Sequence, residues 1–152
     1  GKDPLIAEAF GSRESSGNII VRDAIIGNKQ ENDKVNIHHR IHIDKFTGGV
    51  INSGLFAEKP AFGNVSITVS IRKSDRCEEI SGLVLLTLRD LAAGLVSIGS
   101  GASTGNGYMK ISSINIKDGN SFASICPDKE IQDPDGIIGR YLDKLTGKEA
   151  AL

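Results

Sequence analysis

Apolar and polar residues follow two different periods along this chain. Between residues 65 and 72 apolar and polar positions alternate, which is typical of a half-buried strand. The apolar positions of this run are Val65, Ile67, Val69 and Ile71. Further on, apolar residues recur at helical spacing, at Ile80, Leu83, Val84, Leu88, Leu91 and Leu95. The pattern therefore predicts a strand followed by a buried helix.

Other segments before residue 65 predict further strands and a turn. Residues Leu5 to Phe10 look like the last turn of a helix that Gly11 ends. Residues 18–26 are rich in β-branched side chains and predict a strand. Residues 35–44 predict a second strand, followed by a turn over 47–54 and an arm or hairpin over 55–63. The second strand places two sets of side chains on opposite faces: Ile37, Ile41 and Ile43 on one, His38, Arg40 and His42 on the other.

The buried helix leads into a run of small residues that opens onto another strand. Ser74 or Asp75 is a candidate cap for the helix. The run of small residues spans 99–107, and the next strand spans 108–116 with a bulge expected at Ser112–Ser113. A short helix is expected around residues 137–145, after the capping candidate Asp135. We see no repeat and no domain boundary, so residues 1–152 are predicted to form one α+β domain.

Composition limits the class of protein without identifying it. With 152 residues and 39% hydrophobic content, the chain is long enough for one domain with its own core. No apolar run approaches the roughly 20 residues of a membrane helix, and the first ten residues lack a signal-peptide core, so we expect a cytoplasmic protein. Cys77 and Cys126 have no metal-ligand spacing around them, which argues against a disulfide framework or a zinc site.

Charge gives an ambiguous indication. A net charge of −1 lends no support to nucleic-acid binding by itself. Basic residues gather in the middle of the chain, at Lys34, Arg40, Lys45, Lys59, Arg72 and Lys73. Acidic residues gather near the end, at Asp118, Asp128, Glu130, Asp133, Asp135 and Asp143. This distribution fits one face for RNA and another for a protein partner, and it equally fits an ordinary solvated surface.

The glycine-rich segment is the first candidate for a binding site. A phosphate-binding P-loop needs a Gly-Lys-Ser/Thr ending, and a dinucleotide fingerprint follows a strand, whereas this segment follows a helix. Dense glycines allow backbone amides to approach a phosphodiester chain closely. The candidate contacts are Gly99, Gly101, Ser103, Thr104, Gly105, Asn106 and Gly107.

The histidine-rich strand is the second candidate. His38 and His42 share a strand face, yet four residues of rise separate them by about 13 Å, which is too far for a shared metal ion. A face carrying His38, Arg40 and His42 suits phosphate or base contact better, and plain solvated surface is the alternative. Asp23, Asp44, Ser103 and Thr104 have no partner that completes a catalytic constellation, so we predict no catalytic residue, metal or cofactor.

Three segments together resemble the RAMP superfamily of CRISPR effector proteins, and in particular the backbone subunits of type III complexes. They are AEAFGSRESSGNIIVRDAI, IHIDKFTGGVINSGLF and GLVLLTLRDLAAGLVSIGSGASTGNGYMKI, which lie between about residues 6 and 116. The resemblance implies a modified ferredoxin-like (RRM-like) domain that binds guide RNA (crRNA), with target RNA and other effector subunits as further partners.

The resemblance also implies roles for the two candidate sites. Residues 99–107 would be the loop that contacts the RNA backbone. Residues 40–56 would form a thumb-like hairpin that wedges between bases, with Leu55 and Phe56 as its apolar tip. Arg40, His42 and Lys45 would follow the phosphates and make the affinity sensitive to salt.

Two departures from the family pattern leave alternatives open. Members often carry a basic residue in the loop where this chain has Thr104. The chain also begins after the family's first strand and first helix, so a swapped copy or a separate fragment is expected to cover the open sheet edge. The catalytic aspartate of the RNA-cleaving relatives would lie in sequence absent here. An endoribonuclease subunit and a protein-interaction domain are therefore the alternatives to a guide-RNA-binding subunit.

Overall fold

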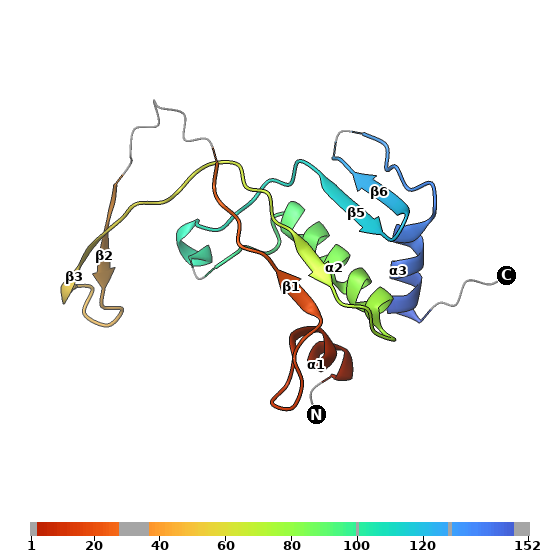
Figure 1. Cartoon of the computed structure of the whole chain (residues 1–152). Coiled ribbons are helices and arrows are strands. Elements are labelled where there is room, and N and C mark those ends of the chain that lie inside the picture. The colour runs from red at the N-terminus through yellow and green to blue at the C-terminus, as the bar shows by residue number, and fades with distance from the viewer. Residues whose placement is uncertain (1–2, 28–36, 100, 128, 148–152) are drawn as a thin grey trace. The chain divides into compact units, whose positions relative to one another are not determined.

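The computed structural model describes residues 3–27, 37–99, 101–127 and 129–147 (Figure 1). Along the chain they form α1 (Pro4–Phe10), β1 (Ile19–Val21), β2 (His38–Ile43), β3 (Val50–Glu58), β4 (Val69–Ile71), α2 (Cys77–Ala92), the 3₁₀ helix η1 (Ala102–Thr104), β5 (Ile114–Asp118), β6 (Ser121–Ile125) and α3 (Ile137–Thr146). The described chain is therefore a mixed α+β protein, as predicted. The start of the predicted strand at Val35, the basic Lys34 and the acidic Asp128 lie outside the described residues.

The strands form three antiparallel pairs, β1–β4, β2–β3 and β5–β6. This mixed architecture is compatible with a ferredoxin-like fold. By contacts the chain divides into two compact units, residues 1–21 with 69–152, and residues 22–68. We call them the core unit and the hairpin unit, and each is described by itself. None of the described helices is long and apolar enough to cross a membrane.

The predicted long strands are mostly shorter in the structure. Within the core unit, Ile19 pairs with Ile71 and Val21 with Val69. The strands predicted over residues 18–26 and 65–72 are therefore three residues long each, because a strand pattern forms a regular ladder only where a neighbour pairs with it. The strand predicted from Tyr108 begins only at Ile114, directly after Ser112–Ser113, where a bulge was expected.

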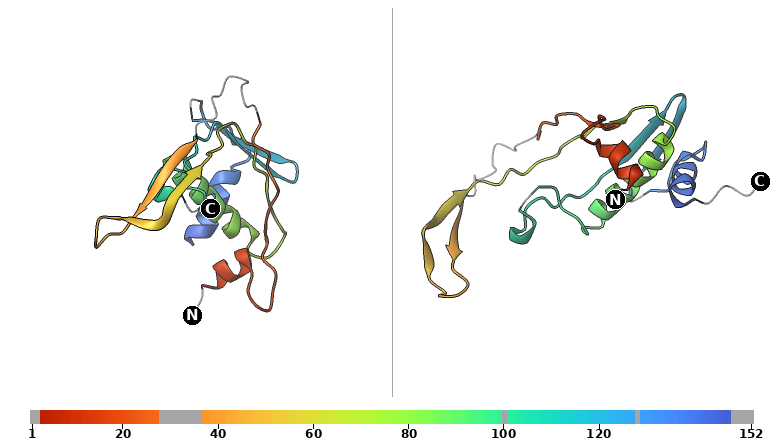
Figure 2. Two further views of the ribbon diagram at one scale, coloured as in Figure 1. Left: turned by 90° about the vertical axis from the view of Figure 1, so that its left-hand side faces the viewer. Right: turned by 90° about the horizontal axis from the view of Figure 1, so that it is seen from below.

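The core of the core unit lies between α2, α3 and the β5–β6 hairpin, and Figures 1 and 2 show α3 beside α2. Ala123, Ile137 and Tyr141 are buried there, with Leu85 and Ile116 packed against them. The strand β6, which contributes Ala123, was not predicted from the sequence.

A glycine in the middle of α2 lets the two helices approach closely. Gly82 is buried, and a Cβ atom on it would lie 2.5 Å from the carbonyl oxygen of Tyr141. Glycine weakens a helix interior by roughly 1 kcal/mol relative to alanine. Its presence here is explained by the backbone of α3 crossing at that point.

The helix termini differ in detail from the predictions. The predicted last turn before Gly11 is a complete short helix, which begins at Pro4 and is capped by the Asp3 carboxylate, 2.8 Å from the Leu5 amide. The α2 helix ends at Ala92 because Gly94 turns the chain with φ +72°, so Leu95 lies beyond it and is 75% exposed. Neither Ser74 nor Asp75 caps α2 with its side chain.

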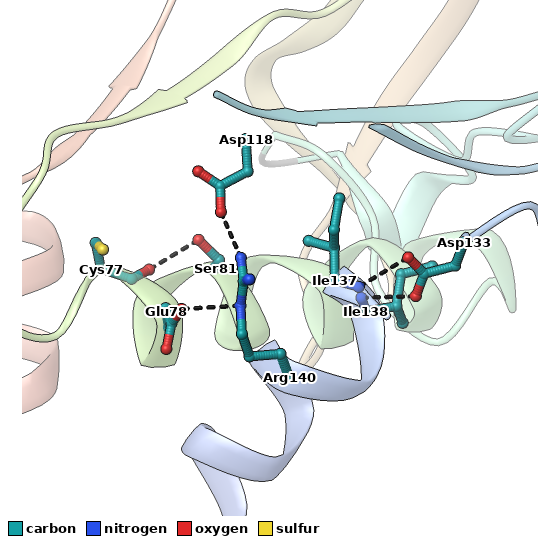
Figure 3. A network of polar contacts seen from close by, with 8 residues as sticks. All are labelled: Cys77, Glu78, Ser81, Asp118, Asp133, Ile137, Ile138 and Arg140. Carbon is teal, nitrogen blue, oxygen red and sulfur yellow. Dashed lines mark hydrogen bonds and ion pairs between the residues drawn. The ribbon is translucent and has the colours of Figure 1, made fainter. Parts of the chain in front are cut away.

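A charged network fixes α3 against the rest of the core unit (Figure 3). Arg140 forms ion pairs with Glu78 of α2 at 2.9 Å and with Asp118 of β5 at 2.5 Å. The Asp133 carboxylate, rather than Asp135, accepts hydrogen bonds from the amides of Ile137 and Ile138 at 2.8 and 2.9 Å. Asp118 and Asp133, two of the acidic residues considered for docking a partner, therefore make contacts within the chain.

Candidate nucleic-acid interface

The hairpin unit contains the predicted hairpin, with a shifted register. Arg40 pairs with Phe56 and Ile41 with Leu55, whereas Ile43 pairs with Val50. Residues directly opposite each other in an antiparallel pair share a face. One face of the hairpin therefore carries Arg40 and Phe56, and the other carries Ile41 and Leu55.

The register shift explains why the predicted turn was too long. The turn ends at Gly49, and residues 50–54 belong to β3. Gly54 is buried at the irregularity, where a Cβ atom would lie 2.7 Å from the Ile51 carbonyl oxygen. Glycine, asparagine and serine are typical turn residues, but in this segment they lie within a strand whose register shifts.

The prediction that Leu55 and Phe56 form the tip is wrong. They lie within β3, opposite Ile41 and Arg40, and residues 44–49 form the tip. The apolar side chain at the tip is Phe46, which is 85% exposed. An Asp-x-x-Thr-Gly-Gly pattern with an aromatic residue inside it is the signal that could have located it.

Hydrogen bonds to Asp44 hold the tip. Its carboxylate accepts from the amides of Phe46 and Thr47 at 2.7 and 3.0 Å. Its carbonyl oxygen accepts from the Gly48 amide at 2.8 Å, and its own amide donates to Gly49 at 2.9 Å. The pKa of the Asp44 carboxyl is lowered because these amides stabilise its charged form. The Thr47 amide has the largest effect and the Phe46 amide the next largest.

The basic residues of the hairpin that are candidate RNA contacts differ in how accessible their charge is to a ligand. Arg40 is half-buried, and its Nε atom lies 2.5 Å from the Glu58 carboxylate, so much of its charge is compensated inside the hairpin. Lys45 is exposed, and its Nζ atom lies over the Phe46 ring, 5.0 Å from the centroid. His38 and His42 are exposed. Among the residues that the structure describes, no group of acidic, histidine and cysteine side chains is arranged for a metal ion.

The glycine-rich loop belongs to the core unit and is exposed over residues 102–105. The Ile98 amide donates to the Gly107 carbonyl oxygen at 2.9 Å and closes the base of the loop. Gly107 has φ +80°, and a Cβ atom there would overlap the Ile98 carbonyl oxygen. This glycine is therefore required by the close approach of two backbone segments.

Hydrogen bonds inside the loop use several of its amides. The Gly101 carbonyl oxygen accepts from the amides of Thr104 and Asn106 at 3.1 and 2.9 Å and from the Thr104 hydroxyl at 2.9 Å. The Gly105 amide donates to Ala102 at 3.1 Å. These amides point into the loop, which differs from the expectation that dense glycines leave amides open to a phosphate.

The outer side of the loop keeps other groups exposed. The Ser103 side chain is exposed, and within the described residues the amides of Ala102 and Ser103 have no intramolecular partner. Gly99 and Gly105 have positive φ, with open space where a side chain would stand. Tyr108, which was not among the predicted RNA contacts, follows the loop and is 58% exposed.

Comparison with known proteins identifies the family. The model of the RAMP superfamily matches residues 1–110, which include both the hairpin and the loop. The chain therefore belongs to the RAMP superfamily, and this membership indicates a CRISPR-associated, RNA-binding role. No curated protein gives a significant match to the chain.

Proposed function

We propose that this protein is a guide-RNA-binding backbone subunit of a type III-like CRISPR effector complex. The observation that carries the proposal is that the family match covers two exposed surfaces, the β2–β3 hairpin with its tip and the loop over 99–107. The proposed RNA contacts are the residues predicted from the sequence, with Phe46 added at the tip. Guide RNA and other effector subunits, or a second copy of the chain, are the proposed partners.

The geometry favours short-range contacts over a strong electrostatic attraction. The net charge is −1, and Arg40 is paired with Glu58. Lys45 places an exposed positive charge at the tip of the hairpin. A single-stranded RNA bound through about two phosphates loses affinity with a slope of about −1.4 in log–log salt plots.

The test is fluorescence anisotropy of a labelled 20-nucleotide single-stranded RNA titrated with the full chain at 50 and 200 mM salt. The proposal predicts saturable binding that weakens by roughly sevenfold over this range. Double-stranded DNA of the same length serves as the control ligand and should bind more weakly. Absence of RNA binding at 50 mM salt would contradict the proposal.

An apolar face of the hairpin favours a second candidate function, a protein-interaction domain. Ile41, Ile43, Val50 and Leu55 are each more than half exposed. A two-stranded hairpin is marginally stable alone in water, and such a face gains stability when another surface covers it. If the chain binds no RNA but forms dimers or larger assemblies in sedimentation experiments, this function replaces the first.

A further inference from the structure

The glycine-rich loop contains the only Asn–Gly pair of the chain, at Asn106 and Gly107. Asparagine is a thermolabile residue, because the backbone nitrogen of the next residue can attack its side-chain carboxamide. A side chain on that next residue hinders the attack, and glycine has none. Every other asparagine of the chain precedes a larger residue, as Asn115 precedes Ile116. The sequence therefore singles out Asn106 for this reaction.

The structure leaves both reacting groups of this pair without a hydrogen bond. Within the described residues, neither the Asn106 carboxamide nor the Gly107 amide has an intramolecular hydrogen-bond partner. Asn106 is half-buried and packs against Gly101, where a Cβ atom would lie 2.7 Å from the Asn106 Cβ atom. Packing thus holds the side chain at the loop, but no hydrogen bond protects its carboxamide from attack.

We propose that Asn106 is a site of spontaneous deamidation and that this modification lowers the affinity of the loop for RNA. The Gly107 nitrogen forms a bond to Cγ of Asn106, and the bond from Cγ to the side-chain nitrogen breaks. Ammonia leaves with the Gly107 amide proton, and a succinimide ring remains. Water then opens the ring to aspartate or isoaspartate, so the reaction needs no oxidant, reductant or enzyme.

Both products add a negative charge to the loop, and one of them also changes its backbone. A carboxylate at position 106 is ionised at neutral pH. Isoaspartate in addition inserts a methylene group into the main chain directly before Gly107. The carbonyl oxygen of Gly107 accepts from the Ile98 amide at 2.9 Å and closes the base of the loop. The effect on affinity rests on the proposed RNA-binding function, since a negative charge there repels phosphates.

Peptide mapping of the folded full chain tests the modification. Trypsin cleaves after Arg89 and Lys110, and Asn106 is the only asparagine or glutamine in peptide 90–110. After incubation for days in mildly alkaline buffer, a growing fraction of this peptide should gain about 1 Da. Chain digested without incubation corrects for changes during digestion.

The same digest contains a matched control, peptide 111–117. Its one asparagine, Asn115, is exposed but precedes the β-branched Ile116. The mass of this peptide should stay constant. If peptide 90–110 also keeps its mass, or if both peptides change to the same extent, deamidation specific to Asn106 is wrong.

RNA binding tests the consequence of the modification. Asn106→Asp imitates the new charge, whereas Asn106→Gln keeps a neutral amide that closes such a ring far more slowly. Asn106→Asp and the incubated wild-type chain should bind single-stranded RNA roughly fivefold more weakly than the fresh chain, as expected for a unit charge about 4 Å from a phosphate in water. Asn106→Gln should bind equally well before and after incubation. Should Asn106→Gln not fold, Asn106→Ser replaces it.

The outcomes separate this inference from the proposed function. If the fresh chain binds RNA and both Asn106→Asp and the deamidated chain bind equally well, the effect on affinity is wrong while RNA binding stands. If the fresh chain binds no RNA, the proposed function fails together with the effect on affinity. Peptide mapping decides the deamidation itself in either case.

Discussion

The core around α3 and the β2–β3 hairpin use apolar residues in opposite ways. Around α3, Ile137 is fully buried and Tyr141 is nearly so, and Arg140 forms ion pairs with α2 and β5. In the hairpin, Ile41 and Leu55 are more than half exposed, and backbone hydrogen bonds hold the strands. The first region buries its apolar side chains, which stabilises the fold, whereas the second leaves its apolar side chains exposed, and we propose binding only for the second.

The largest expected effect contrasts a buried with an exposed aliphatic side chain. Ile137→Ala removes a fully buried side chain and should lower the free energy of unfolding by about 2–5 kcal/mol. Leu55→Ala truncates a residue that is 67% exposed and should change the free energy of unfolding by less than about 0.5 kcal/mol. Urea unfolding followed by circular dichroism measures both. A large loss for Leu55→Ala would show that the hairpin face is covered in solution.

The second prediction concerns the close approach of α2 and α3. Gly82→Ala places a Cβ atom against the Tyr141 carbonyl group and should destabilise the chain by about 1–3 kcal/mol, despite the better helix propensity of alanine. Gly139→Ala is the matched control, since Gly139 is an exposed residue of α3 with open space around it. It should stabilise the chain by about 1 kcal/mol. Equal effects of the two changes would contradict the described packing of the helices.

The third prediction concerns the start of α3. Asp133→Ala removes the carboxylate that accepts from the amides of Ile137 and Ile138, and should cost about 1 kcal/mol of unfolding free energy. Asp135→Ala should cost little, because this exposed residue does not cap the helix. Thermal unfolding of the two variants tests whether Asp133 caps α3. A larger loss of stability for Asp135→Ala than for Asp133→Ala would show that Asp135 is the cap.

The smallest effect is a pH dependence that differs between the two regions. Burial, the main cause, raises the pKa of Tyr141 above 10.0, so its contribution to stability is present below pH 10 and is lost as pH rises through the folded pKa. The pKa of Asp44 is lowered below 3.8, so its contribution is present above that value and is lost as pH falls through the folded pKa. NMR titration should show the hairpin tip changing in acid and the α3 region changing in base. Changes of the hairpin tip in base and of the α3 region in acid would contradict the contacts described for Asp44 and Tyr141.

Regular patterns allowed part of the fold to be predicted from the sequence. The apolar spacing from Ile80 to Leu91 and from Ile137 to Leu145 located α2 and α3, because a buried helix face repeats over several turns. The β6 strand was missed, since Ala123 is its only fully buried residue and leaves no strong alternation. The role of Gly82 could not be predicted, because it depends on the backbone of α3, which is far away in the sequence.

The candidate site was predicted less completely than the fold. The glycine loop and the hairpin were located by residue type, but the internal bonds to Gly101 and the Arg40–Glu58 pair depend on local geometry. The tip was misplaced because a pattern of Gly, Asn and Ser does not distinguish a turn from a bulged strand. The roles proposed for residues 99–107 and for the hairpin remain predictions.

Hydrogen–deuterium exchange with and without a single-stranded 20-nucleotide RNA tests the central claim most directly. If the chain binds RNA through the two proposed surfaces, amides within residues 38–58 and 99–107 should exchange more slowly in the complex. The amides of α3 and of the β5–β6 hairpin should exchange at the same rate in both states. Protection confined to α3 and β5–β6, or no protection at a saturating RNA concentration, would contradict this account.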